Sequence, residues 1–127
     1  MEQTATVVGL LSFGWLTVFQ LLLASGLPLG RMAWGGANRI LPPNLRIASL
    51  ISAAVAGFAW VAFAQTGGLV SGIIPDGWLG PLFWGLTGLF SASFLANLFG
   101  AHGAERAHGV PLTLLCGGSS LALALGG

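Results

Sequence analysis

Four long apolar stretches dominate this sequence and restrict the folds that it can adopt. They run from about residues 5 to 27, 45 to 66, 77 to 101 and 111 to 127. A helix needs about 20 apolar residues to cross the hydrocarbon core of a bilayer. The first three stretches reach that length, and the fourth, with 17 residues, lies at the lower bound. None alternates as membrane β-strands do, so we predict an all-α, four-transmembrane-helix bundle that forms a single domain over 1–127.

The composition agrees with a chain that is surrounded by lipid. Apolar residues make up 55% of the 127 residues and charged residues only 6%, whereas about a quarter of an ordinary soluble domain is charged. So few charged side chains cannot cover a water-soluble fold of this size. The lipid bilayer is therefore the first expected partner. With a net charge of +1, the chain is not expected to bind nucleic acid.

The arginines predict an orientation for the bundle. In a chain of four spans, the first and third loops lie on the same side of the membrane. All four arginines fall in those loops or at their edges, namely Arg31, Arg39, Arg46 and Arg106. Because cytoplasmic loops carry an excess of basic residues, we predict that this side is cytoplasmic and that both termini lie outside. The longer first loop is rich in apolar residues, so we expect it to lie in the membrane interface.

Small residues recur at every fourth position along the third stretch. This small-residue stripe consists of Gly88, Ala92, Ala96 and Gly100. Such stripes let helix backbones approach closely in lipid, where hydrophobic exclusion gives no help. We expect the stripe to pack within the bundle, and the alternative is a seam with a second copy or a larger membrane complex.

Two amide side chains interrupt the spans near the predicted cytoplasmic side. Gln20 precedes the end of the first stretch by seven residues, which places it about 10 Å deep. Asn97 lies near the end of the third stretch. Intramembrane amides usually form hydrogen bonds across a bundle, and that is the structural interpretation. The alternative is a polar vestibule open to the cytoplasm, with these residues as candidates: Gln20, Asn97, Arg31, Arg46, Glu105 and Arg106.

The third loop contains a cluster of ionisable residues, His102, Glu105, Arg106 and His108. Their spacing is not a zinc-binding signature, so we expect solvated loop residues and no metal site. No carboxylate, lysine or histidine falls inside a predicted span, which argues against a proton-coupled transporter. The single cysteine, Cys116, has no histidine placed to activate it. We therefore predict no catalytic residues and a protein that is not an enzyme, and the sequence identifies no cofactor.

Several short motifs occur together in the chain. They are Gly26-x-Pro28-x-Gly30, Trp34-Gly35-Gly36 and Leu41-Pro42-x-x-Leu45-Arg46-x-x-Ser49, followed by Asn97 and Glu105-Arg106. In this combination the chain resembles a family of small four-helix integral membrane proteins of bacteria, over most of its length. The resemblance implies four spans and a place in the bacterial cytoplasmic (inner) membrane. It implies no activity and no catalytic residue.

Three functions stay open at this point. The first is a non-enzymatic scaffold or accessory subunit that packs against itself or a larger membrane complex. The second is a passive channel or a transporter of small solutes or ions, with Gln20 and Asn97 along the path. The third is a lipid-binding protein or membrane enzyme that uses the arginine-rich first loop on phosphate head groups. The first is favoured because the sequence lacks positive signs of catalysis.

Overall fold

The computed structural model describes residues 2–33, 38–100 and 103–126, and this part of the chain is helical without strands. Its elements are α1 (Glu2–Ala24), the short 3-10 helix η1 (Gly30–Met32), α2 (Pro43–Thr66), α3 (Asp76–Gly100) and α4 (Gly103–Gly126). Each α-helix is long and apolar enough to cross a membrane, which confirms the four predicted spans. Trp34 to Ala37 and His102 lie outside the described residues.

Helix α1 ends three residues earlier than predicted, and Gly26 is the reason. Its φ angle is 93°, in the left-handed region that favours glycine. The Gly26 N–H donates to the Leu23 carbonyl (3.1 Å), and the Leu27 N–H donates to the Leu22 carbonyl (3.2 Å). This pair of bonds satisfies carbonyl groups that the end of a helix leaves without partners. Helix α1 therefore stops at Ala24, before it reaches Pro28.

Helix α4 begins eight residues earlier than predicted. The sequence prediction placed its start at Pro111, but Pro111 lies inside a helix that begins at Gly103. Proline removes one backbone hydrogen bond, and helices in membranes tolerate this because neighbouring groups can replace it. Glu105 lies in the first turn, where a carboxylate interacts favourably with the helix dipole. The predicted third loop is therefore mostly helix, and α4 is 24 residues long.

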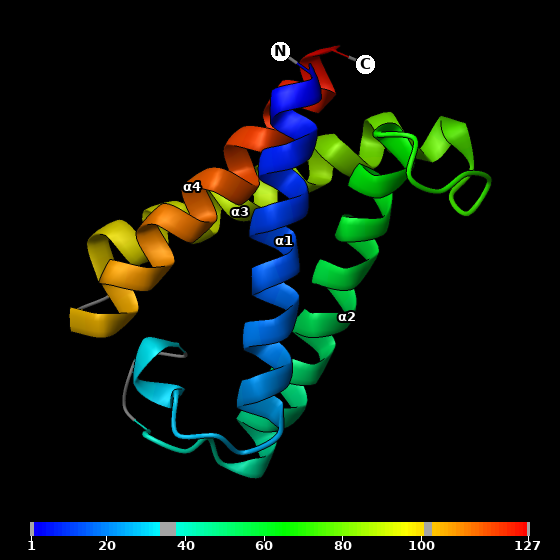
Figure 1. The fold of residues 1–127 in the computed structure, drawn as a ribbon. Helices are drawn as coiled ribbons and strands as arrows, with labels where there is room; N and C mark the ends of the chain where they lie inside the picture. Colours follow the sequence, from blue (N-terminus) through cyan, green and yellow to red (C-terminus); the bar gives the residue numbers. More distant parts are fainter. Residues whose placement is uncertain (1, 34–37, 101–102, 127) are drawn as a thin grey trace.

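The helices form two hairpins that diverge, instead of a closed bundle (Figure 1). Helix α1 packs along α2, and α3 packs along α4. The hairpins meet mainly through α1 and α4. The start of α1 lies beside the second half of α4, whereas α2 and α3 separate toward the side of the first loop (Figure 1). This divergence leaves space between the hairpins on that side.

An aromatic cluster joins the hairpins where they meet. Phe13 of α1 lies 5.3 Å from Phe63 of α2 and 5.1 Å from Phe90 of α3, measured between ring centroids. Phe83 of α3 contacts Phe63 edge-on at 5.1 Å. Phe13 and Phe63 are fully buried. Edge-to-face pairs of this kind are favourable beyond their buried area by about 0.5–1.5 kcal/mol each.

The small-residue stripe of α3 does not pack within the chain, so that expectation is wrong. Gly88, Ala92, Ala96 and Gly100 are all exposed. No described atom lies within 4 Å of a Cβ built on Gly88 or Gly100. Another face of α3 packs on α4, where a Cβ on Gly117 would lie 3.5 Å from that of Phe90. The small residues that bring α3 and α4 together therefore lie on α4.

Candidate functional site

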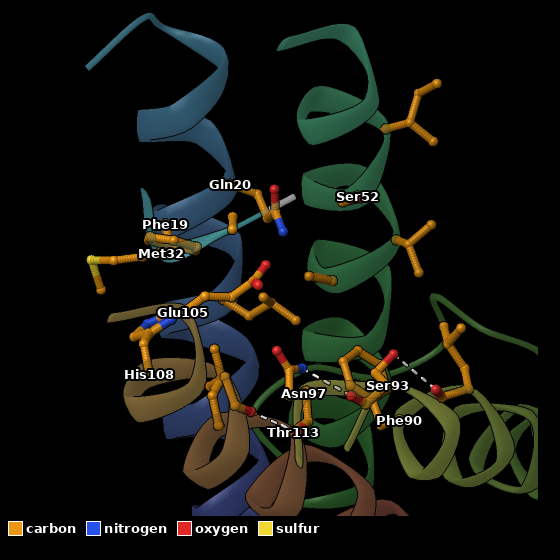
Figure 2. A pocket seen from close by; sticks show the side chains of 18 residues that line it. Phe19, Gln20, Met32, Ser52, Phe90, Ser93, Asn97, Glu105, His108 and Thr113 are labelled. Atoms are coloured by element: carbon orange, nitrogen blue, oxygen red, sulfur yellow. Dashed lines mark hydrogen bonds between the residues drawn. The ribbon is translucent and has the colours of Figure 1, made fainter. Parts of the chain in front are cut away.

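A partly enclosed cavity of about 410 Å³ lies between the two hairpins (Figure 2). All four helices and the segment that contains η1 contribute to its wall. The lining residues are Leu16, Phe19, Gln20, Met32, Ala33, Ile51, Ser52, Val55, Ala56, Leu89, Phe90, Ser93, Asn97, Glu105, His108, Gly109, Leu112 and Thr113. The wall is thus largely apolar, with a few polar groups placed in it.

Three of the polar side chains enter the cavity from different helices. Figure 2 shows Gln20 of α1, Asn97 of α3 and Glu105 of α4 reaching into the same space. The Oε1 atom of Gln20 is buried and accepts no hydrogen bond from any described residue. A buried acceptor without a partner is costly, by about 1–3 kcal/mol. Gln20 therefore marks the point in the wall that most requires a hydrogen-bond donor.

The neighbouring polar groups use their hydrogens within their own helices. The Asn97 side-chain amide donates to the Ser93 carbonyl at 2.9 Å. The Ser93 hydroxyl donates to the Leu89 carbonyl at 3.0 Å, and the Thr113 hydroxyl donates to the Gly109 carbonyl at 2.6 Å. These bonds occupy hydrogens and leave side-chain oxygens with free lone pairs. The polar part of the wall therefore presents the oxygens of these side chains as acceptors, together with the second Asn97 N–H as a donor.

His108 connects the two hairpins at the edge of the cavity. The Trp15 indole N–H donates to His108 Nε2 at 2.7 Å, and the Phe19 ring lies 4.4 Å from the imidazole. An indole nitrogen can only donate, so Nε2 must carry a lone pair and the imidazole hydrogen must be on Nδ1. This arrangement holds His108 in its neutral form.

The depth of His108 corrects the prediction that no ionisable group lies inside a span. Trp15 is nine residues from the end of α1, which is about 14 Å along the helix axis. His108 is half-buried beside it. Glu105 lies one turn earlier on the same face of α4 and also lines the cavity. Neither residue is the solvated loop residue that the sequence predicted.

The predicted vestibule is assembled only in part. Gln20, Asn97 and Glu105 come together, but Arg46 and Arg106 do not line the cavity. The Arg46 Nε–H donates to the Ala24 carbonyl at 2.9 Å, so this arginine binds the end of α1. Arg106 is exposed beside Leu98 and Val110. The side chain of the sixth candidate, Arg31, lies outside the described residues.

Sequence reasoning missed the part that His108, Ser52 and Thr113 play in the wall. A signal for His108 was present, because Glu105, His108 and Leu112 follow a helical spacing. Pro111 concealed this signal, since it was interpreted as the first turn of the helix. No local signal distinguishes Ser52 from the other small residues of α2.

Comparison of the chain with protein-family models, with curated proteins and with solved structures gave no match. The resemblance to small bacterial membrane proteins therefore stays a prediction. The class that the fold defines is a multi-pass α-helical membrane protein. Any more specific function must be argued from the cavity.

Proposed function

We propose that this protein binds a small solute in the cavity between its hairpins and that binding serves the movement of the solute across the membrane. The cavity carries this proposal. Its volume of about 410 Å³ falls in the range of small-molecule sites, about 300–1,000 Å³. Such sites combine a mostly apolar wall with a few placed polar groups. The wall between these hairpins has that composition.

The ionisable residues of α4 support the proposal. Glu105 and His108 lie in a helix apolar enough to span a membrane, and both line the cavity. Ionisable groups are costly inside a bilayer, and they commonly mark the paths of substrates, ions or protons. The hydrogen bond that the Trp15 indole N–H donates to His108 Nε2 explains how the imidazole is accommodated in this apolar helix. Gln20, Asn97 and Glu105 are polar side chains that project into the cavity from three different helices.

We also propose that the side of the first loop faces the cytoplasm of a bacterial cell, with both termini outside. Arg39 lies in the loop between α1 and α2, Arg46 lies in the first turn of α2, and Arg106 lies in the first turn of α4. These positions share one side if all four helices span. The excess of basic residues on cytoplasmic loops supports this orientation.

A photolabelling experiment tests for a binding cavity. The full chain is placed in lipid nanodiscs and irradiated with an aryl trifluoromethyldiazirine that carries a methyl, hydroxymethyl or aminomethyl group. The labelled peptides are then mapped by mass spectrometry. We expect saturable labelling of the cavity wall by at least one probe, and Ser52→Phe should abolish it by filling the cavity.

The matched control is Ala54→Phe, which adds a ring to an exposed position of α2 that lines none of the cavities. It should leave wall labelling unchanged. Labelling that is spread evenly over the exposed helix faces, or that survives Ser52→Phe, would reject the cavity as a binding site.

Passage across the membrane is tested separately, by swelling of protein-containing vesicles in isosmotic glycerol, urea or methylammonium chloride. Swelling that persists in both Gln20→Leu and Asn97→Leu would argue against a transport path through these residues.

A second candidate function is assembly with a further copy or a larger complex through α3. The supporting observation is that the small-residue stripe is exposed along its whole length, although such stripes let helices approach closely in membranes. If the stripe mediates assembly, Gly88→Leu should reduce the particle mass in mild detergent. Ala54→Leu on α2 is the control. An unchanged mass in both variants would reject assembly through this face.

A further inference from the structure

The cavity opens sideways, between α2 and α3. Three of its apolar lining residues are also exposed on the surface, namely Ile51 (61% exposed), Val55 (44%) and Leu89 (50%). A residue that both lines a cavity and is exposed lies at its mouth. Figure 1 shows the two helices separating on this side, and their described residues have little contact. We refer to this opening, which Ile51, Val55 and Leu89 border, as the lateral mouth.

The lateral mouth lies at the depth of the lipid acyl chains. Val55 is twelve residues from the first-loop end of α2, and Leu89 is eleven residues from the end of α3 on the same side. At about 1.5 Å per residue, these positions are about 16–18 Å deep. The hydrocarbon core of a bilayer is about 30 Å thick. The lateral mouth therefore faces acyl chains near the middle of the core.

The first loop covers part of the cavity on the loop side. Met32 and Ala33 line the cavity and pack against a buried apolar cluster of Phe19, Leu23 and Leu41. The segment that contains them also contacts α4, and Figure 1 shows it (cyan) between α1 and the start of α4. Because this cover lies toward the water and the lateral mouth lies toward lipid, the cavity is more accessible from the bilayer.

The polar end of the cavity provides both hydrogen-bond acceptors and donors. Gln20 Oε1 is buried and accepts no hydrogen bond from a described residue. Asn97 has a second N–H besides the one that it donates to Ser93. Glu105 already has an interaction within the protein, so the wall does not require a charged ligand. A hydroxyl both donates and accepts hydrogen bonds, and it is therefore a suitable neutral head group.

We infer that the cavity takes a single-chain amphiphile from the bilayer, with a neutral hydroxyl head beside Gln20 and an alkyl tail that leaves through the lateral mouth. This inference rests on the proposed binding function and specifies the ligand class and its route of entry. Figure 2 shows Gln20, Asn97 and Glu105 reaching into the space that the head occupies. A tail that stays among acyl chains exposes no apolar surface to water.

A chain-length series of 1-alkanols tests the lateral mouth. Decanol, tetradecanol and octadecanol compete with the hydroxymethyl diazirine probe for the cavity wall in nanodiscs, and their amounts are expressed as mole fractions in the lipid. A tail beyond the mouth lies among acyl chains in both the free and the bound state, so the half-inhibiting mole fractions should agree within about threefold. A cavity closed toward the lipid could not enclose long tails, and a loss of about tenfold or more at octadecanol would overturn the inference.

Val55→Trp places a larger side chain at the lateral mouth. It should weaken competition by octadecanol about tenfold, while the hydroxymethyl probe, which has no tail, still labels the wall. Ala54→Trp adds the same ring at the neighbouring exposed position, which lines none of the cavities, and should have no effect. Unchanged competition in Val55→Trp would mean that the tail does not pass between α2 and α3.

Gln20→Leu tests the position of the head. Tetradecanol and its methyl ether both accept hydrogen bonds, but only the alcohol donates one, as Gln20 Oε1 requires. The alcohol should bind the native protein about fivefold more tightly than the ether does, and the two should bind Gln20→Leu equally. Equal binding to the native protein would reject the hydroxyl head. Size-exclusion profiles and helical circular dichroism verify that each variant is folded.

The outcomes separate this inference from the proposed function. If the hydroxymethyl probe labels the wall saturably and Ser52→Phe abolishes this labelling, but octadecanol does not compete, the binding cavity stands and entry from the bilayer is rejected. If no probe labels the wall saturably, both proposals fail.

Discussion

At the scale of single residues, Gly9 sets how closely α1 approaches α2. A Cβ at this position would collide with the ring of Phe63. That ring cannot retreat, because it is fully buried and held between Phe13 and Phe83. Gly9→Ala should therefore lower the unfolding free energy by about 1–3 kcal/mol. Gly85→Ala on α3 has open space around it and should be neutral or slightly stabilising, as thermal unfolding in detergent can show.

A second prediction concerns the contribution of the hydrogen bond between Trp15 and His108 to stability. Trp15→Phe keeps an aromatic ring but removes the donor, which leaves His108 Nε2 without its partner. We expect a loss of about 1–3 kcal/mol. Trp84→Phe, at an exposed site on α3, should cost little. In a double-mutant cycle with His108→Leu, the two effects should not add, because both substitutions remove the same contact; full additivity would contradict the bond.

At the scale of the elements, the end of α1 depends on Arg46 of α2. This arginine donates to the Ala24 carbonyl (2.9 Å), and its guanidinium lies 3.4 Å from the place where a Cβ on Gly26 would stand. A cation at the C-terminal end of a helix is favourable, by about 0.3–1 kcal/mol. Arg46→Gln should therefore increase amide hydrogen exchange in the last turn of α1. Arg39→Gln, at an exposed loop position, should leave it unchanged, and equal exchange in the two variants would contradict this role.

The elements also show what a sequence can predict in such a chain. Helices α1, α2 and α3 were predicted to within about three residues at each end, because their length follows from the thickness of the bilayer. The start of α4 was missed because Pro111, two residues after Gly109, resembles the first turn of a helix. Gln20 and Asn97 stood out as polar groups in apolar runs. His108 did not, because its partner Trp15 is 93 positions away in the sequence.

At the scale of the whole molecule, the aromatic cluster and the divergence of the hairpins have a common origin. Large side chains of α3 pack on α4 and on Phe63 and Phe13. They join α2 and α3 near the loop that connects these helices, and between the described residues α2 and α3 otherwise have little contact. The cavity occupies the region beyond this cluster, beside Gln20 and Glu105. Packing at one end thus leaves the cavity at the other.

The proposed topology can be tested on the whole molecule with single cysteines. The native Cys116 is fully buried, so the unmodified protein should give almost no background with a membrane-impermeant maleimide. If four helices span and the first loop is cytoplasmic, Ser71→Cys and Leu125→Cys should react from outside intact cells. Asn38→Cys should react only after the membrane is opened, because its loop lies on the other side. Labelling of Leu125→Cys on the same side as Asn38→Cys would mean that α4 does not cross, and the cavity could not then form between two membrane-spanning hairpins.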